Sequence, residues 1–448
     1  MNIIVIVLDS LRRDHLGCYG NSWMKTPNLD KFSEQAVSFD NAFAEGLPTI
    51  PVRTELITGQ TSLPFRPWQP LVKEDVTAAE LLRRHGYLCG MVADTYHMFK
   101  PDMNFHRGMH SYQWIRGQES DAYKPGPAQI DTSWCVPPAM KGTPVANMLV
   151  QYLRNVSERK REEDYFCAQV MRTAVDWLKD AAGRSPFFLW VDSFDPHEPW
   201  DPPPDFEAMY ADPDYDGYRL IHPKYGPVDW MSDEELTHVK ALYAGEVSFV
   251  DKWTGKLLDA LDKSGLADDT TVLIMADHGH PHGDHGLIMK HDSNLYAELV
   301  RIPLLLRHPK GLHAGERVDG LVQIRDILPT LLDVAGLPAP VGMHGTSAWP
   351  LVSGEADSIR EYAVSGYHES PYRTVRDKRW ALIVTPDGQD DELYDMIADP
   401  TEQKNIIAQH RDVAERMRSH LGEYTFTKRP RTWMDIQTRY EVSHTPAG

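Results

Sequence analysis

Short apolar runs alternate with longer amphipathic segments through the first three-quarters of the chain. Five of these runs predict strands that are buried on both faces: "IIVIVL" at 3–8, "YLCGMVA" at 87–93, "FFLWV" at 187–191, "TVLIMA" at 271–276 and "IPLLLR" at 302–307. Strands that alternate with helices favour a mostly parallel sheet with helices on both faces. The pattern therefore predicts an α/β fold.

The clearest helix is predicted over residues 232–265. Ser232 and Glu235 form a capping box at its start. An apolar stripe with helical spacing then follows at Leu236, Val239, Tyr243, Val247, Val250, Leu257 and Leu261. This segment should pack one face against the rest of the domain.

The pattern changes near residue 360. The segments 362–369, 372–377 and 379–385 predict antiparallel strands, and 412–424 predicts a helix. We therefore expect a catalytic domain over 1–358, a C-terminal α+β subdomain over 359–430 and a tail over 431–448. The region 101–145, rich in Pro, Gly, His and Trp, is interpreted as a long excursion that shapes a pocket.

Charge and length limit the partners. The 448 residues are 42% hydrophobic, which is enough for a large core, and the formal net charge is −19. So negative a protein is a poor partner for nucleic acid or an anionic membrane. An anionic substrate would need a local positive site.

The N-terminal segment and the spacing of the cysteines predict a cytoplasmic location. The apolar start "NIIVIVLDS" is too short to cross a bilayer and lacks the features of a secretory signal. The four cysteines lie far apart, which favours reduced thiols over a disulfide framework. The tail segment "TWMDIQTRY" at 432–440 is compatible with packing in a homo-oligomer and equally with an exposed end.

Candidate metal ligands follow three of the predicted strands. Asp9, His197 and the pair Asp277 and His278 come after buried runs, and parallel strands end at a common edge. An isolated Asp after a strand is commonly a turn or a helix cap. The dense cluster beside Asp277 favours a metal over a histidine-rich surface loop; it comprises His278, His280, His282, Asp284 and His285. His282 or His285 could complete a second metal site.

Thr49, in "GLPTIPVRTELITG" at 46–59, has two interpretations. With Pro51 in the first helical turn, Thr49 suits a position at or just before the helix cap, without any catalytic role. A hydroxyl at a helix N-terminus also lies in a positive field, and Arg53 falls on the same face one turn later. A metal bound to that hydroxyl would make it a nucleophile.

Several motifs, in order, resemble the sulfatase family of the alkaline phosphatase superfamily. "NIIVIVLDSLRRDHLGCYG" resembles the first metal motif, and "GLPTIPVRTELITG" resembles the nucleophile motif Cys/Ser-x-Pro-x-Arg. "DPHEPW" is similar to the Pro-His-x-Pro motif, and "ADHGHPHGDHGLIMKH" to the second metal motif with its lysine. "QIRDILPTLLDVAGLPAP", "HGTSAWPLV" and "ELYDMIADPTEQKN" resemble later landmarks of the family.

The resemblance implies a role for each matching residue. One divalent metal, Mn²⁺ or Zn²⁺ in preference to Ca²⁺, would be held by Asp9, Thr49, Asp277 and His278. Thr49 would be the nucleophile, with Arg53, His197 and Lys290 as the other catalytic residues; Thr95, His97 and His285 would contact the substrate.

Three departures from the family pattern bear on the chemistry. Sulfatases convert the cysteine or serine of the nucleophile motif to formylglycine, and Thr49 cannot form that aldehyde because its β-carbon carries a methyl group. Ser10 stands where many sulfatases have a metal-binding Asp, and Thr95 where they have a lysine. Fewer charges in the pocket are compatible with a singly charged substrate.

These departures favour a hydrolase of phosphate diesters or phosphonate monoesters that acts through a covalent phosphothreonine. Its partner would be a small anionic ester. One alternative is a sulfatase that works without formylglycine, and another is a phospho-group transferase, against which the lack of a membrane anchor counts. A catalytically dead binding module would have little reason to keep Asp9, Arg53, His197, Asp277, His278 and Lys290.

Overall fold

The computed structural model describes residues 1–422 of the chain, and these residues form two compact units. Unit 1 contains Met1–Ser38, Ala79–His291 and Pro303–Arg317. Unit 2 contains Phe39–Ala78, Asp292–Ile302 and the described residues from Val318 onward. Both units therefore combine segments that are far apart in the sequence.

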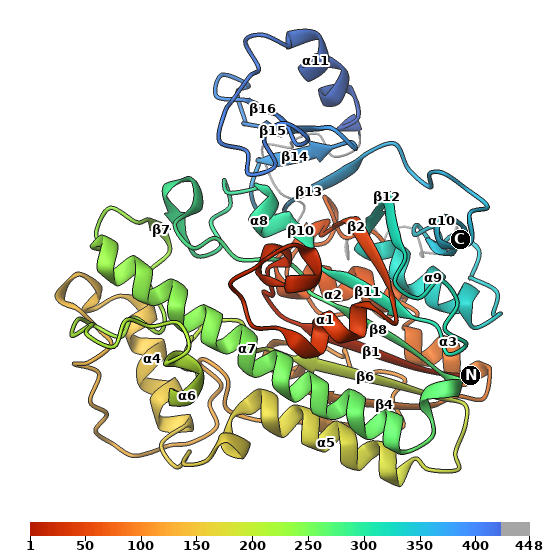
Figure 1. The fold of residues 1–448 in the computed structure, drawn as a ribbon, viewed down its shortest axis with the longest axis horizontal. Coiled ribbons are helices and arrows are strands. Elements are labelled where there is room, and N and C mark those ends of the chain that lie inside the picture. The colour runs from red at the N-terminus through yellow and green to blue at the C-terminus, as the bar shows by residue number, and fades with distance from the viewer. Residues whose placement is uncertain (423–448) are drawn as a thin grey trace, which may run out of the picture. The chain divides into compact units, whose positions relative to one another are not determined.

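Unit 1 is built on a central sheet (Figure 1). Its strands are β1 (Asn2–Leu8), β4 (Leu88–Ala93), β5 (Ser111–Trp114), β6 (Phe187–Ser193), β8 (Thr270–Met275) and β11 (Leu304–Arg307). Their order across the sheet is β11-β8-β1-β6-β4-β5. All neighbours are parallel except β11, which is antiparallel to β8 and also pairs with the first residues of β2 (Val37–Phe43).

Continuous apolar sequence explains the centre of this sheet. Every residue of β1, β6 and β8 is buried. Side chains alternate between the two faces of a strand, so a strand that is apolar throughout must be covered on both faces. The five predicted strands are confirmed; the edge strand β5, whose first three residues are exposed, has no apolar run to mark it.

Helices of unit 1 pack on the sheet and on each other. They are α1 (Pro27–Ser33), α3 (Ala78–Arg84, whose first residue belongs to unit 2), α4 (Pro144–Asn155), α5 (Phe166–Asp180), α6 (Pro204–Glu207) and α7 (Asp233–Lys263). Helix α5 packs against β4 and β6 and lies beside the long helix α7 (Figure 1). The predicted capping box is confirmed, since Ser232 and Glu235 bond each other's backbone N–H groups at the start of α7. A two-stranded pair, β7 (Gly226–Pro227) with β9 (Leu287–Ile288), completes the unit.

Unit 2 holds a second sheet, with strand order β16-β15-β14-β13-β3. These strands are β3 (Gly46–Leu47), β13 (Ala363–Tyr367), β14 (Arg373–Arg376), β15 (Trp380–Val384) and β16 (Glu392–Asp395). The strands β13 to β16 are antiparallel neighbours, whereas β3 is parallel to β13. The remaining elements are β10 (Arg301–Ile302), β12 (Arg317–Gln323), α2 (Thr49–Thr58), α8 (Ala297–Val300), α9 (Ile327–Val334), α10 (Trp349–Ser353) and α11 (Arg411–Ser419).

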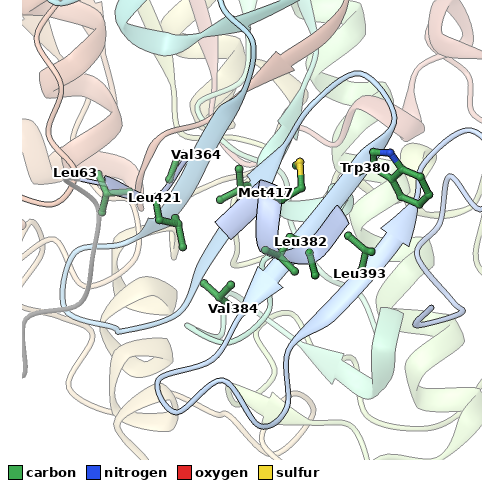
Figure 2. Close-up of a cluster of buried hydrophobic side chains, with 10 residues drawn as sticks. Leu63, Val364, Trp380, Leu382, Val384, Leu393, Met417 and Leu421 are labelled. Atoms are coloured by element: carbon green, nitrogen blue, oxygen red, sulfur yellow. The ribbon is translucent and has the colours of Figure 1, made fainter. Parts of the chain in front are cut away.

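An apolar cluster joins this second sheet to α11 (Figure 2). Met417 and Leu421 meet residues of β13, β14, β15 and β16, among them Leu382 and Leu393, and all four side chains are buried. The three antiparallel strands and the helix predicted near the C-terminus are thereby confirmed, and β16 is added to them.

The predicted α/β class, with a mostly parallel sheet and a smaller C-terminal α+β part, is confirmed. The domain limits at 358 and 430 stay predictions, and the predicted tail 431–448 lies outside the described residues. Across residues 1–422, none of the helices combines the length and apolar character that a membrane span requires.

Candidate active site

Asp9, Asp277 and His278 come together at one edge of the unit 1 sheet. Asp9 follows β1, and Asp277 and His278 follow β8, which is the parallel neighbour of β1. All three side chains are fully buried. One ligand atom from each lies within 4.8 Å of the other two. Two carboxylates and one imidazole at these separations fit a divalent metal ion.

Backbone and side-chain contacts orient this cluster. The Asp277 Oδ1 atom accepts hydrogen bonds from the backbone N–H of Ser10 at 3.0 Å and of His278 at 2.8 Å. The Ser10 hydroxyl donates to Asp9 Oδ1 at 2.8 Å, so this residue supports a ligand. The Nδ1 atom of His278 lies 2.8 Å from the carbonyl oxygen of Gly279. A carbonyl only accepts, so the neutral ring carries its lone pair on Nε2, as metal-binding histidines do.

A second group of buried polar side chains surrounds Glu198. Lys290 Nζ donates to both carboxylate oxygens of Glu198 at 2.9 Å and to His197 Nε2 at 2.8 Å. The other ring nitrogen of His197 donates to the carbonyl oxygen of Glu198 at 2.7 Å. Two of the predicted catalytic residues, His197 and Lys290, are thus in direct contact with each other.

Electrostatics keep His197 neutral and Glu119 ionised. Burial, together with the nearby Lys290 charge, lowers the pKa of His197 to about 3. Burial alone would raise the pKa of Glu119, but the hydrogen bond with His97 lowers it to about 2. The neutral ring of His197 accepts a hydrogen bond from Lys290 through Nε2, and its Nδ1 lies 3.8 Å from the charged carboxylate of Glu119.

The three residues predicted to contact substrate differ in their surroundings. The Thr95 hydroxyl is buried and donates to Asp192 Oδ1 at 2.6 Å. His97 lies in the short helix Tyr96–Phe99, with Nε2 at 3.4 Å from Glu119 Oε2. His285 has a left-handed backbone conformation, with φ of 52°. Their contact with substrate stays a prediction.

Thr49 and Arg53 belong to unit 2. Thr49 is the first residue of α2 and is buried; Pro48 is the N-cap, so the side chain of Thr49 does not cap the helix. Arg53 is also buried, and its Nη1 donates to the carbonyl oxygen of Thr49 at 3.2 Å. The expected one-turn spacing of hydroxyl and guanidinium on α2 is confirmed.

Glu119, Glu198 and His222 were not predicted as site residues. One ligand atom from each of these buried residues lies within 4.8 Å of the other two. Within the described chain, neither ligand cluster contains His282 or His285, the residues that the sequence suggested for a second site. Glu198 occupies the variable position of the "DPHEPW" motif. Its charge at this position is the one sequence feature that could have indicated a role in the site. Glu119 and His222 are distant in sequence, and only the fold brings them to it.

Comparisons with known proteins identify the family of the chain. The sulfatase family model matches residues 1–337, and the model described as N-sulphoglucosamine sulphohydrolase, C-terminal, matches residues 283–426. An arylsulfatase of Clostridium perfringens is 27% identical, covering 91% of this chain and 90% of that protein. An N-acetylglucosamine-6-O-sulfatase of Bacteroides thetaiotaomicron is 25% identical over 91% of this chain and 82% of its own.

The crystal structure of a phosphonate monoester hydrolase from Agrobacterium radiobacter shares the fold, with a TM-score of 0.74 and 20% identity over 94% of this chain and 95% of that one. That likeness shows the fold, a mostly parallel sheet with a smaller second sheet. The family-model match shows more, because it covers most of the chain: the protein belongs to the sulfatase family of hydrolases.

Proposed function

We propose that this sulfatase-family hydrolase cleaves sulfate esters of small molecules at the Asp9, Asp277 and His278 cluster. The observation that carries the proposal is this buried three-residue set at the ends of β1 and β8, in a chain that matches sulfatases over most of its length. When bound, a divalent cation would polarise the ester and offset the negative charge of its oxygens. Mn²⁺ or Zn²⁺ is proposed for this site.

The remaining steps are assigned to side chains of the protein. The Thr49 oxygen would attack sulfur and lose its proton, and the bond from sulfur to the alcohol oxygen would break. The alcohol would leave with a proton from Lys290, and the proton lost by Thr49 would restore Lys290. Water would then attack the sulfated Thr49, which releases sulfate and restores the hydroxyl. Arg53 would stabilise the negative oxygens, and the Lys290 contact to His197 would hold the proton donor in place. We also retain the cytoplasmic location as part of the proposal.

Phosphate diesters or phosphonate monoesters are the second candidate substrates, and Thr49 is the observation that favours them. A threonine cannot become formylglycine, whereas a phosphorylated threonine is readily released by water. Glu119 and Glu198 add negative charge beside His197 and Lys290, which disfavours doubly charged phosphate monoesters but not the singly charged diesters, phosphonate monoesters or sulfate esters. Both candidates share the same nucleophile.

A matched panel of nitrophenyl esters would test both candidates. Rates would be measured with nitrophenyl sulfate, bis(nitrophenyl) phosphate, nitrophenyl phenylphosphonate and nitrophenyl phosphate, with Mn²⁺ or Zn²⁺ present. We expect sulfate turnover to dominate and Thr49→Ala to reduce kcat by at least about 10³-fold. Dominant turnover of the diester or phosphonate would select the second candidate.

The control is Thr54→Ser in the same helix, because a serine can keep the hydrogen bond that Thr54 donates to the Ile50 carbonyl. This variant should retain the wild-type rates. If Thr49→Ala were as active as Thr54→Ser, Thr49 would not be the nucleophile.

A further inference from the structure

Three side chains of unit 1 converge on Glu198 in a way that the hydrolysis does not require. One ligand atom from each of Glu119, Glu198 and His222 lies within 4.8 Å of the other two. The Nε2 atom of His280 lies 3.0 Å from Oε2 of Glu198. We propose that Glu119, Glu198 and His222 bind a second divalent metal ion, with His280 beside them against Glu198, and we call these four residues the Glu198 cluster.

The histidines of this cluster are held in the tautomer that a metal needs. Nδ1 of His280 lies 3.0 Å from the carbonyl oxygen of Pro281, and Nδ1 of His222 lies 2.9 Å from that of Pro223. Each carbonyl can only accept, so each Nδ1 must carry the proton. In the neutral rings the lone pair is then on Nε2, the same arrangement as in His278.

These lone pairs face a carboxylate. Nε2 of His280 is buried and faces the carboxylate of Glu198. Its nearest charged neighbour is the Glu198 oxygen at 3.0 Å, and Nε2 of His222 lies 3.9 Å from the other oxygen. Two acceptors that face each other repel unless a proton or cation lies between them. A metal ion bound by Glu198 and His222 would turn the His222 contact into ligation and would weaken the repulsion of His280 by neutralising Glu198.

The charge balance also calls for a cation. Glu119 and Glu198 bring two negative charges into a buried space, and Lys290 brings one positive charge, at 2.9 Å from Glu198. With neutral imidazoles the group keeps an excess negative charge, which is unfavourable away from water. A bound divalent cation would remove that excess.

Hydrogen bonds from neighbouring side chains hold both carboxylates in place. Metal ligands in proteins are commonly oriented by such bonds. The Tyr225 hydroxyl donates to Glu198 Oε1 at 2.9 Å, and the Tyr96 hydroxyl donates to Glu119 Oε2 at 2.8 Å. Glu119, Glu198 and His222 offer one nitrogen and two carboxylates. Metal bonds of about 2.0–2.2 Å place ligand atoms about 3–4 Å apart, and Nε2 of His222 lies 3.9 Å from Glu198 Oε1. This donor set suits Zn²⁺ or Mn²⁺.

The Glu198 cluster shares no residue with the Asp9, Asp277 and His278 cluster. The proposal therefore goes beyond the proposed function and is independent of the substrate. The test counts bound metal ions and does not measure hydrolysis. The second metal site can therefore be refuted in a protein that hydrolyses esters, and supported in a protein that does not.

The experiment uses the full chain, stripped with a chelator and titrated with Zn²⁺ alone. Bound zinc is counted by elemental analysis after dialysis, and calorimetry gives each Kd. We expect two equivalents in the wild type and one in Asp277→Asn. In Glu119→Gln/His222→Gln one equivalent should remain, with the second Kd weakened by at least about 10–100-fold.

The matched control is His282→Gln. His282 is buried in the same loop, and its ring stacks on His280 with centroids 4.9 Å apart, but it belongs to neither cluster. This variant should keep two equivalents, and circular dichroism would establish that every variant is folded. One equivalent in the wild type, two tight sites in Glu119→Gln/His222→Gln, or loss of a site in His282→Gln would overturn the proposal.

Replacement of Zn²⁺ by Co²⁺ gives a second readout, because the visible spectrum of Co²⁺ reports its ligands. The absorption of Co²⁺ bound at the Glu198 cluster should disappear in Glu119→Gln/His222→Gln. The same absorption should persist in Asp277→Asn. An unchanged spectrum in the first variant would contradict ligation by the Glu198 cluster.

Discussion

Single buried polar residues of unit 1 hold the loops that carry the site. Arg12 is the clearest case, because its guanidinium donates to Asp284 Oδ2 at 2.6 Å, to Asp14 and to the carbonyl oxygen of His280 at 3.1 Å. Burial alone would raise the pKa of Asp284, but the Arg12 charge lowers it to about 2. One side chain thus anchors the segment between His280 and Asp284.

Replacing this anchor should loosen the segment. We expect Arg12→Lys to lower the free energy of unfolding by about 1–3 kcal/mol, because an ammonium cannot reproduce the fork of guanidinium hydrogen bonds. Urea denaturation would measure the change. Arg161→Lys, at a side chain that is 74% exposed, should change stability by less than about 0.5 kcal/mol. Equal effects of the two variants would contradict the anchoring role.

At this scale the sequence predicted side chains that gather from neighbouring strands better than side chains that gather from separate loops. Asp9, Asp277 and His278 could be predicted because each directly follows a strand of the same sheet. Glu119 could not, because it lies in the long region 101–145, where no periodicity indicates which way a side chain points. Asp9 and His278 are joined by neighbouring strands, whereas Glu119 reaches Glu198 only through the packing of loops.

Packing between elements depends on a glycine in β4. A Cβ at Gly90 would lie 2.3 Å from the indole of Trp177 on α5. That indole donates to the Ser111 hydroxyl of β5 at 2.8 Å, so it cannot move away without losing this hydrogen bond. The absence of a side chain at Gly90 is what lets α5 approach the sheet.

Adding a methyl group at this position should separate the elements. We expect Gly90→Ala to lower the free energy of unfolding by about 1–3 kcal/mol through overpacking. Thermal and urea denaturation would measure it. Gly126→Ala is the control, since its Cβ would meet no atom closer than 3.8 Å, and it should be neutral. A neutral Gly90→Ala would show that the indole has room to shift.

Attachment of α11 to the second sheet should depend on Met417. Its side chain is fully buried in the apolar cluster (Figure 2), whereas Glu415 on the same helix is exposed. We expect Met417→Ala to lower stability by about 2–5 kcal/mol and Glu415→Ala to have little effect. Denaturation followed by the fluorescence of Trp380, which belongs to the same cluster, is the measurement. A small effect of Met417→Ala would mean that the helix contributes little to this unit.

Element prediction succeeded where the apolar pattern was strong. The runs that became β1, β6 and β8 are apolar without interruption, and the helix stripe of α7 is long. It failed for β2, whose run is interrupted by Asp40 and Asn41, and for the exposed edge strand β5. The antiparallel direction of β11 also has no local signal, since the same apolar run suits either orientation.

The response of the whole molecule to acid should combine opposing contributions. Burial and the neighbouring positive charges lower the pKa of His282 well below its usual value, so the folded protein holds this ring neutral. Unfolded chains protonate histidine near pH 6.5, and the unfolded state then binds the extra proton. Stability from His282 is therefore lost as the pH falls below about 6.5. Glu55 acts in the opposite sense, because burial raises its pKa.

A difference measurement isolates the histidine. Between pH 6 and 5, the unfolding free energy of wild type should fall more steeply than that of His282→Gln, by up to about 1.4 kcal/mol per pH unit. His85→Gln, at an exposed histidine, should leave the slope unchanged. Denaturant midpoints across this pH range would provide the slopes. Identical slopes for wild type and His282→Gln would show that His282 titrates normally in the folded state.

The pairing of β3 with β13 has a consequence for how the protein is made. Gly46 is in register with Gly366, so the segment just before Thr49 finds its strand partner 320 positions later. During synthesis the N-terminal part of the chain leaves the ribosome first. The segment that forms β3 therefore stays unpaired until β13 has also emerged. A nascent chain arrested before this point would carry Thr49 on an unsupported segment, which is a natural target for chaperones. A truncated protein that ends at residue 358 would lack β13 altogether, so its β3 segment would have no strand partner at any time.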